Sequence, residues 1–319
     1  MLFQWGMLAA VITAFGGPSV FGLAELDPPI AGPGAEIVDV TLAGVNYADV
    51  HHRRGEYARP PLPGVLGADV VGRRRADGRR VAALLRTGGG YAQVAAAPAG
   101  HVVEIPDEVS DEQALAVLEQ GLTAWHSLHT VGRVTGDDVV VVTAAAGGVG
   151  HLAVQLARAA GARVIGCASS EAKRAFLAGL GAHATVDSNH PDLGAALDET
   201  PTLVLDGVGG RTFEQLHAAL APFGRTVAYG RVGDVRDTVA VDDLMTSSTG
   251  VHGFWLQRVL DDEELYRSSA SRLFRLSGLG MLTARIGGRY PLSGVGQAHA
   301  DLEDRITAGK LVIDVNRLG

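Results

Sequence analysis

The clearest hydrophobic pattern lies between residues 139 and 160. Four valines, Val139–Val142, form an uninterrupted β-branched run, which is typical of a strand buried on both faces of a parallel sheet. The next eight residues are rich in alanine and glycine, and apolar residues then recur at helical spacing from Val149 to Ala160. The pattern predicts a strand, a glycine-rich turn and a helix.

The rest of the chain shows two kinds of pattern. Before residue 119, short alternating runs separated by glycine and proline predict strands at 9–13, 36–42, 81–85 and 91–96. From residue 119 to 261, strands alternate with helices, which predicts a doubly wound parallel sheet. The strands predicted there are 139–143, 163–168, 183–187, 202–206 and 226–229, and the helices are 148–160, 171–180 and 211–221.

These patterns predict an α/β protein with two domains. A charged helix at 262–280 and mixed short elements at 283–319 follow the alternating region. We therefore expect a β-rich catalytic domain, formed by residues 1–118 and 262–319, into which a Rossmann domain, residues 119–261, is inserted.

The glycine-rich turn predicts a dinucleotide site because of its position. In the pattern G-x-G-x-x-G it corresponds to Ala145-x-Gly147-x-x-Gly150, with alanine in place of the first glycine. Small residues let a pyrophosphate approach the backbone, and the helix N-terminus offers free N–H groups and a positive dipole end. Strand, turn and helix in this order favour a dinucleotide site over an ordinary strand-to-helix turn, which is the alternative.

The end of the second strand of this domain indicates which dinucleotide is bound. An NAD site usually has an acidic residue there, whereas this chain has Ser169, Ser170 and, three residues later, Lys173. Hydroxyl donors and an ammonium group suit a 2′-phosphate, so the sequence favours NADPH. In the alternative interpretation Ser170 only caps the next helix and Lys173 is a surface charge.

Composition and charge exclude several classes of protein. With 319 residues, 47% of them hydrophobic and 19% charged, the chain is expected to be globular. Its net charge of −8 argues against nucleic acid or an anionic membrane as the main partner. The single cysteine, Cys167, excludes an internal disulfide and a multi-cysteine metal site. The apolar stretch 7–15 has no cationic leader and is too short to span a bilayer, so we expect a cytoplasmic protein.

Several motifs together resemble one family. They are Gly44-Val45-Asn46-Tyr47-Ala48-Asp49, Arg54-Gly55-Glu56-Tyr57, Gly89-Gly90-Tyr91-Ala92, Gln120-Gly121-Leu122-Thr123-Ala124 and the glycine-rich turn. The combination resembles the zinc-independent quinone oxidoreductase (zeta-crystallin-like) family of the medium-chain dehydrogenase/reductase superfamily, over nearly the whole chain. The resemblance implies a GroES-like fold for the β-rich domain, a homodimer, and a small-molecule quinone or enone as the acceptor.

The resemblance also implies a metal-free protein. Alcohol dehydrogenases of the superfamily hold zinc through a cysteine and the histidine of a G-H-E segment. Here the cysteine position is Asn46, and the segment reads Gly67-Ala68-Asp69, with Ala68 in place of the histidine. Neither asparagine nor alanine is a serviceable zinc ligand, so we expect no metal.

The cofactor contacts implied by the resemblance are assigned by position. Lys173 matches the residue that binds the 2′-phosphate, Gln120 and Thr123 match positions beside the nicotinamide, and Lys310 lies in a terminal segment near the cofactor. The turn and the strand ends supply the remaining expected contacts, which are Ala145, Gly147, Gly148, Val149, Ser169, Ser170, Val208, Gly230 and Phe254.

Hydride transfer places negative charge on the carbonyl oxygen of the acceptor, and this charge needs a donor. Asn46 can donate from its amide and Tyr57 from its phenol. We hypothesise that both lie at this oxygen, with the final proton coming from Tyr57 or water. The alternatives are that Asn46 is a turn residue, that Tyr57 packs on Pro60 and Pro61, and that His51 transfers the proton.

The leading prediction is an NADPH-dependent oxidoreductase that reduces a quinone or an α,β-unsaturated carbonyl. One alternative is an enoyl-thioester or polyketide-tailoring enoyl reductase, which would need a basic channel for its acyl carrier. The arginines that are candidates for such a channel are Arg53, Arg54, Arg73, Arg74, Arg75, Arg79 and Arg80. A third interpretation is an NADPH-binding protein without turnover.

Overall fold

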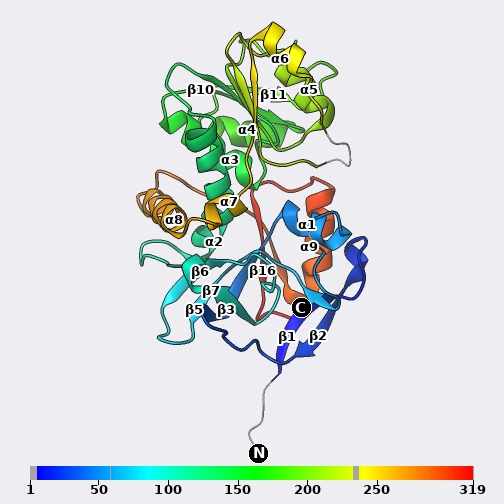
Figure 1. The fold of residues 1–319 in the computed structure, drawn as a ribbon, viewed down its shortest axis with the longest axis vertical. Helices are drawn as coiled ribbons and strands as arrows, with labels where there is room; N and C mark the ends of the chain where they lie inside the picture. Colours follow the sequence, from blue (N-terminus) through cyan, green and yellow to red (C-terminus); the bar gives the residue numbers. More distant parts are fainter. Residues whose placement is uncertain (1–5, 58, 233–236, 319) are drawn as a thin grey trace, which may run out of the picture. The chain divides into compact units, whose positions relative to one another are not determined.

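The computed structural model describes residues 6–57, 59–232 and 237–318 (Figure 1). The chain divides into two units. Unit 1 contains Met1–Glu119 and Gln257–Gly319, and unit 2 contains Gln120–Leu256. Unit 1 is therefore built from two separate stretches of the chain, and unit 2 from the single stretch between them.

Unit 2 alternates strands and helices along the chain. Helix α2 (Asp111–Trp125) begins in unit 1 and ends in unit 2. The further elements are η3 (His126–Val131), β9 (Val139–Val142), α3 (Gly148–Ala159), β10 (Arg163–Ala168), α4 (Glu171–Gly179), β11 (Ala184–Asp187), β12 (Leu203–Asp206), α5 (Gly210–Ala218), β13 (Arg225–Ala228), α6 (Val241–Ser247) and β14 (Gly250–Gly253).

The strands of unit 2 form one parallel sheet in the order β11-β10-β9-β12-β13-β14. This is the Rossmann order, in which the direction of winding reverses between β9 and β12. The valine run is β9, and Val140, Val141 and Val142 are completely buried, because helices cover both faces of such a sheet. The predicted doubly wound parallel sheet is confirmed.

Unit 1 is mainly β-structure with a few helices. Its elements before unit 2 are β1 (Met7–Ile12), η1 (Pro18–Val20), β2 (Phe21–Leu26), β3 (Ala35–Val45), α1 (Tyr47–Arg54), β4 (Gly64–Val65), β5 (Asp69–Arg74), β6 (Arg80–Leu84), β7 (Val94–Pro98), η2 (Ala99–His101) and β8 (Val102–Glu104). After unit 2 it continues with α7 (Gln257–Leu260), α8 (Glu263–Gly278), β15 (Ile286–Pro291), η4 (Leu292–Gly294), α9 (Val295–Glu303) and β16 (Lys310–Asp314).

Strand β3 is central to the main sheet of unit 1. The sheet runs in the order β15-β16-β3-β5-β6-β8, and β7 pairs with the first half of β3. A smaller sheet has the order β2-β1-β4. The two stretches of unit 1 therefore meet where β16, from the end of the chain, pairs with the second half of β3.

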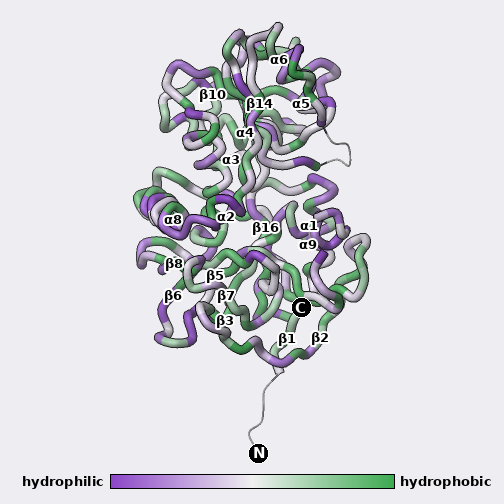
Figure 2. The backbone as a smooth tube through the Cα atoms, viewed as in Figure 1, coloured by the Kyte–Doolittle hydropathy of each residue, from purple (hydrophilic) through white to green (hydrophobic). Residues whose placement is uncertain are grey.

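Helix α8 shows the charged face expected from its sequence. Asp262 caps it by accepting a hydrogen bond from the Leu265 N–H over 3.0 Å. Tyr266, Leu273 and Phe274 on one face are buried, and hydrophilic and hydrophobic residues alternate along the helix (Figure 2). Within the described part of the chain, no helix has the length and apolar character needed to cross a membrane.

Candidate active site

The glycine-rich turn connects β9 to α3 at the carboxyl edge of the sheet of unit 2. Ala144 is in the left-handed region (φ 43°), and the Gly147 N–H donates to its carbonyl over 2.8 Å. The Ala145 N–H donates to the Cys167 carbonyl on β10 over 2.9 Å. A Cβ on Gly150 would lie 2.5 Å from the Ala144 carbonyl oxygen, so glycine is required where α3 approaches β9. Because the left-handed residue is Ala144, alanine is tolerated at position 145.

Helix α3 begins with residues predicted to bind the cofactor. Gly147 is its N-cap, and Gly148 and Val149 are its first residues, where the N–H groups have no partner inside the helix. His151 is completely buried, and its Nδ1 lies 2.7 Å from the Gly147 carbonyl oxygen. Since a carbonyl oxygen only accepts, Nδ1 carries the proton. His151 therefore helps to hold the turn, a role that we did not predict.

A buried carboxyl shapes the neighbouring loop after β12. Asp206 accepts hydrogen bonds from the Thr143 hydroxyl over 2.8 Å, the Val208 N–H over 3.1 Å and the Gly209 N–H over 2.9 Å. Burial raises the pKa of Asp206, although these hydrogen bonds oppose the rise. Thr143 belongs to the turn after β9, so Asp206 joins the two loops at the point where the strand order reverses.

The end of β10 carries the candidate phosphate contacts. Ser169 and Ser170 are exposed and Lys173 is half-buried. The Ser170 hydroxyl caps α4 by accepting from the Lys173 N–H over 3.4 Å. Capping uses the oxygen of Ser170 as an acceptor and is compatible with donation of its hydroxyl hydrogen to a phosphate. Arg174 also lies here and contacts Asp187 at the end of β11 over 3.3 Å.

The remaining predicted residues of unit 2 lie at the same edge or on α2. Gly230 follows β13 and Phe254 follows β14. Both strands are parallel to β9, so these two residues lie at the same carboxyl edge of the sheet as the glycine-rich turn. Gln120 lies beside the turn, with its Cγ 2.9 Å from the point where a Cβ of Gly148 would stand. Thr123 lies one helical turn further along α2. Except for Gln120 and Thr123, the residues predicted in unit 2 thus follow the carboxyl ends of parallel strands.

In unit 1, the ends of three adjacent strands bring polar residues together. Asn46 follows β3, Asp69 begins β5 and Lys310 begins β16, and β3 lies between the other two strands. Lys310 Nζ donates to Asn46 Oδ1 over 2.6 Å and to Asp69 Oδ2 over 2.8 Å. Asn46 Nδ2 donates to Asp69 Oδ1 over 2.7 Å. A Cβ on Gly44 would lie 2.3 Å from the Asp69 carboxylate, so this glycine leaves space for the ion pair.

Asp49 completes what we call the Asn46–Lys310 group, which comprises Asn46, Asp49, Asp69 and Lys310. Asn46 is the N-cap of α1, and its N–H and Nδ2 donate to Asp49 Oδ2 over 3.0 and 3.2 Å. Both amide hydrogens of Asn46 therefore meet carboxylates. All four residues are at most 4% exposed. The structure places Lys310, which we expected near the cofactor, within this group.

The group has more acids than cations. Burial, with the negative charge of Asp69, raises the pKa of Asp49 to about 6. Glu119 on α2 feels the charges of the same group, and burial raises its pKa to about 8, although Lys310 opposes the rise. Glu119 is therefore mainly neutral at pH 7, which limits the net negative charge.

Tyr57 follows the end of α1 and folds back against it. Its ring stacks on that of His51, with the ring centres 4.6 Å apart and the planes inclined by 25°. His51 is 2% exposed and its Nδ1 is hydrogen-bonded to Glu56. Tyr57 and His51 thus lie together, whereas Asn46 is at the opposite end of the helix.

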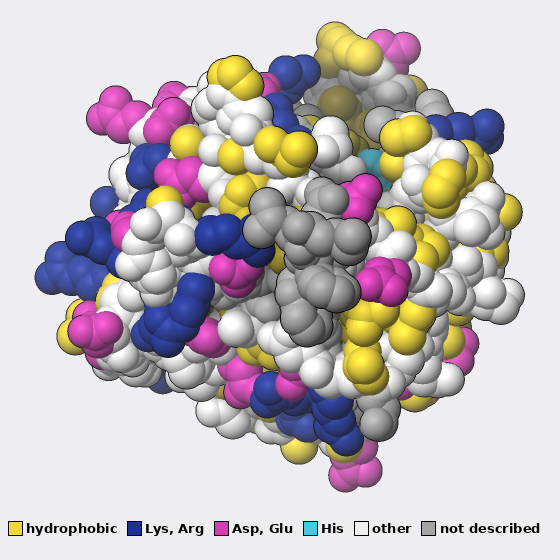
Figure 3. Space-filling model, turned by 90° about the horizontal axis from the view of Figure 1, so that it is seen from below, with side chains coloured by type: hydrophobic (Ala, Val, Ile, Leu, Met, Phe, Trp, Pro, Cys, Tyr) yellow, Lys and Arg dark blue, Asp and Glu magenta, His cyan; other side chains and the backbone are white. Residues whose placement is uncertain are grey.

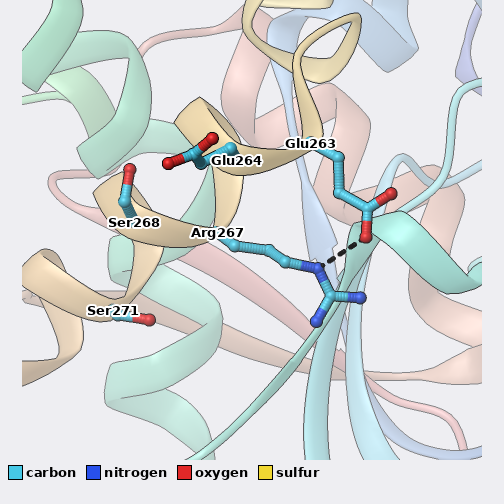
Figure 4. A pocket seen from close by; sticks show the side chains of 5 residues that line it. All are labelled: Glu263, Glu264, Arg267, Ser268 and Ser271. Atoms are coloured by element: carbon cyan, nitrogen blue, oxygen red, sulfur yellow. Dashed lines mark hydrogen bonds and ion pairs between the residues drawn. The ribbon is translucent and has the colours of Figure 1, made fainter.

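A surface hollow on α8 is distinct from these residues. Figure 4 shows its lining, Glu263, Glu264, Arg267, Ser268 and Ser271. All five are exposed, and Arg267 is paired with Glu263 over 3.0 Å. This hollow contains no buried reactive group among the described residues.

The zinc positions of the superfamily are occupied as the sequence indicates. Asn46 takes part in the group described above and Ala68 precedes Asp69. In residues 6–57, 59–232 and 237–318, no three histidine, cysteine, aspartate or glutamate side chains are grouped so that they could hold a metal ion. The cation that contacts Asn46 and Asp69 in this structure is Lys310.

Comparison with known proteins identifies the family. Residues 32–107 match the family model described as alcohol dehydrogenase GroES-like domain, and residues 148–273 match that described as zinc-binding dehydrogenase. The chain is 31% identical over 315 residues to a quinone oxidoreductase of Pseudomonas aeruginosa, covering 94% of this chain and 97% of the relative. The chain belongs to the quinone oxidoreductase family.

Further comparisons agree with membership of the quinone oxidoreductase family. A 2-haloacrylate reductase of a Burkholderia species is 30% identical over 330 residues, covering 96% of this chain and 98% of the relative. The structure of Escherichia coli quinone oxidoreductase in complex with NADPH matches with a TM-score of 0.91 at 27% identity, covering 97% of this chain and all of that one. The predicted family is confirmed, as is the fold, a Rossmann domain combined with a GroES-like domain.

Proposed function

We propose that this chain is an NADPH-dependent oxidoreductase that transfers hydride to a quinone or an α,β-unsaturated carbonyl compound. The observation that carries the proposal is the carboxyl edge of unit 2, where the turn at Gly150 and the candidate phosphate contact Lys173 follow adjacent strands. The quinone oxidoreductase and the 2-haloacrylate reductase, similar over nearly their full lengths, support quinones and electron-poor alkenes as the class of acceptor.

The residues of unit 2 fit NADPH. The missing Cβ at Gly150 lets α3 pack closely against the turn after β9, and the first N–H groups of α3, at Gly148 and Val149, are suited to donate to a pyrophosphate. Ser170 and Lys173 offer a hydroxyl and an ammonium group to a 2′-phosphate. When bound, NADPH supplies the hydride, and the protein binds and orients both reactants.

In unit 1 we propose Asn46 as the donor to the acceptor oxygen, and Tyr57, which follows the opposite end of α1, as a source of the final proton. Of the two hydrogen bonds from Asn46 Nδ2, that to Asp49 is longer, at 3.2 Å. An acceptor oxygen would replace this bond at the lower cost. Lys310, bonded to the amide oxygen of Asn46, polarises the amide and makes it a stronger donor.

One panel of assays tests the proposal. NADPH oxidation is followed with a benzoquinone, a 2-alkenal and a crotonyl thioester, each with and without a chelator. We expect turnover with the quinone or the alkenal. Tight NADPH binding without turnover on any acceptor would instead favour a binding protein.

We also propose that the reaction proceeds without zinc. Asn46 and Ala68 stand at the ligand positions, and the Lys310 ammonium lies beside Asn46 and Asp69, where a bound cation would be repelled. Activity in the panel should be unchanged by the chelator. A loss of activity that added zinc restores would contradict this proposal.

The charges of unit 1 argue against a docking channel for an acyl carrier. Arg74 and Arg79 pair with Glu104, each over 2.7 Å, and Arg75 pairs with Asp39. On the face shown in Figure 3, basic and acidic side chains are interspersed. These arginines are therefore largely neutralised, and we favour a small-molecule acceptor over a carrier-bound thioester.

We further propose a homodimer in the cytoplasm. The dimer is supported by β14, which is the edge of its sheet, and by exposed apolar side chains nearby. Phe223 is 86% and Met245 70% exposed, and the Phe223 N–H donates to the Ser248 carbonyl just after α6. The cytoplasmic location is supported by the use of NADPH.

A further inference from the structure

Four buried side chains of unit 1 form a chain of hydrogen bonds that ends on Asp49. Arg53 on α1, His299 on α9 and Tyr91 before β7 are each 0% exposed, and Asp49 is 2% exposed. Arg53 Nη1 lies 3.3 Å from His299 Nδ1, and His299 Nε2 lies 3.1 Å from the Tyr91 hydroxyl. That hydroxyl donates to Asp49 Oδ2 over 3.1 Å. The proposed function assigns no role to Arg53, His299 or Tyr91.

The hydrogen bonds of this network all donate in one direction, from Arg53 toward Asp49. The direction is set by Arg53 because its guanidinium can only donate. Arg53 thus donates to His299 Nδ1, and the imidazole proton lies on Nε2. Burial and the charge of Arg53 lower the pKa of His299 to about 3, so the imidazole is neutral. His299 Nε2–H therefore donates to the Tyr91 oxygen, which leaves the single Tyr91 hydrogen for Asp49.

Arg53, at the end of the hydrogen-bond network away from Asp49, is held in place by further hydrogen bonds. Arg53 Nε donates to the Gly16 carbonyl over 3.0 Å, and its Nη2 donates to Glu303 Oε2 over 2.7 Å. Glu303 also accepts from Arg54. Since a guanidinium stays protonated in proteins, Arg53 cannot pass a proton on. The chain therefore orients groups and does not conduct protons.

The ionised form of Asp49 needs hydrogen-bond donors, because burial and the nearby charge of Asp69 disfavour a negative charge there. Its Oδ2 accepts from the Asn46 N–H, from Asn46 Nδ2 and from Tyr91. A hydroxyl that donates to a carboxylate stabilises its ionised form, so the Tyr91 hydrogen bond favours the charged Asp49. Burial and the charge of Asp69 act in the opposite direction. The titratable and charged groups that face Asp49 are His52 and Arg53 on α1, Asp69 on β5, Tyr91, Glu119 on α2, His299 on α9 and Lys310 on β16.

We propose that Arg53, His299 and Tyr91 are positioning residues that keep Asp49 ionised and thereby hold Asn46 and Lys310 in the arrangement required for reduction of the acceptor. This inference rests on the proposed function, and it deepens that proposal within unit 1. Protonation of Asp49 would remove an acceptor from the Asn46 amide and free that amide to rotate.

The first test compares two tyrosine variants. Tyr91→Phe removes the donor to Asp49, whereas Tyr266→Phe removes an equally buried hydroxyl of unit 1 that donates to the His101 carbonyl over 2.8 Å. We expect the acid limb of the kcat/KM profile to move to higher pH by about 0.5–1 unit in Tyr91→Phe, and to stay unchanged in Tyr266→Phe. Coincident profiles for wild type and Tyr91→Phe would overturn the inference.

A second pair of variants decides the question if Tyr91→Phe does not fold. His299→Gln keeps an N–H donor near the position of Nε2, and His299→Leu removes it. We expect the shift in His299→Leu and its rescue in His299→Gln. Equal profiles for these two variants would show that His299 only fills space.

Direct titration separates this inference from the proposed function. The Asp49 carboxyl is followed by carbon-13 NMR in wild type, Tyr91→Phe and His299→Leu, with its signal assigned from Asp49→Asn. We expect a higher pKa in both variants, whether or not an acceptor is reduced. An active enzyme with unchanged titration would refute the inference alone, whereas shifted titration without turnover on any acceptor would refute the proposed function alone.

Discussion

We expect single residues at the end of β10 to determine which dinucleotide unit 2 prefers. Lys173 is half-buried there, beside Ser169 and Ser170. We expect Lys173→Ala to weaken NADPH binding by about 1.5–3 kcal/mol, which is about ten- to a hundredfold, because a charge-assisted contact to the 2′-phosphate is lost. NADH binding should not change, since it lacks that phosphate. Isothermal titration with both cofactors measures the effect, with Lys173→Arg as the charge-preserving control, and an unaltered preference for NADPH in Lys173→Ala would exclude this lysine.

Glu119 should make stability depend on pH. Its pKa is raised from 4.5 to about 8, first by burial, so the folded state binds more protons than the unfolded state between these values. The free energy of unfolding therefore falls as pH rises from about 4.5 to about 8, and this contribution is fully favourable only below 4.5. We expect Glu119→Gln to gain stability relative to wild type progressively over this range.

Urea unfolding at pH 5, 6, 7 and 8 measures that difference. Glu264→Gln, on the exposed face of α8, is the matched control and should run parallel to wild type. If Glu119→Gln also ran parallel, Glu119 would be titrating normally in the folded protein.

Some residues of the candidate site can be predicted from the sequence, and others become visible only in the folded structure. Gly150, Ser170 and Lys173 are identified by their place after a strand, which is local information. Tyr91 and His299 are 208 positions apart, and neither carries a local sign that it contacts the other. Lys310 was expected near the cofactor, and only the pairing of β16 with β3 shows its bonds to Asn46 and Asp69.

At the level of elements, the contact between α3 and β9 requires a residue without a side chain. A Cβ on Gly150 would lie 2.5 Å from the Ala144 carbonyl oxygen and 2.6 Å from the Ala145 Cα. We expect Gly150→Ala to lower stability by about 1–3 kcal/mol, because backbone must move to relieve the overlap, and to weaken NADPH binding as the turn shifts.

Thermal unfolding and cofactor titration check this prediction. Gly179→Ala is the control, since no atom lies within 4 Å of its added Cβ. In helix α4 it should stabilise slightly, because alanine favours helix more than glycine. Equal behaviour of the two variants would mean that α3 tolerates a side chain at position 150.

Elements with strong periodicity were predicted closely, and those without it were not. The helix expected at 171–180 is α4, Glu171–Gly179, and the valine strand is β9. Strand β14 was missed because Gly-Val-His-Gly has neither the length nor the apolar run of a buried strand. Its place at the edge of the sheet, with one neighbour, explains why it needs neither.

For the whole molecule, the exposed edge of unit 2 leads to a prediction about assembly. Among the described residues, no strand pairs with the outer side of β14, and Phe223 and Met245 expose apolar surface. We expect sedimentation equilibrium to give a dimer for the wild type and a monomer for the double variant Phe223→Glu and Met245→Glu, because burying two carboxylates at an interface is costly. Ile30→Glu, at a 92% exposed position of unit 1, should remain dimeric. A monomeric wild type would refute the dimer.

The discontinuity of unit 1 has a consequence for biosynthesis. A ribosome releases Asn46 and Asp69 early, then all of unit 2, and only afterwards β16 with Lys310. Unit 2 can therefore fold on a nascent chain before Lys310 has been synthesised and can pair with Asp69. The Asn46–Lys310 group of unit 1 can form only after β16 has been synthesised.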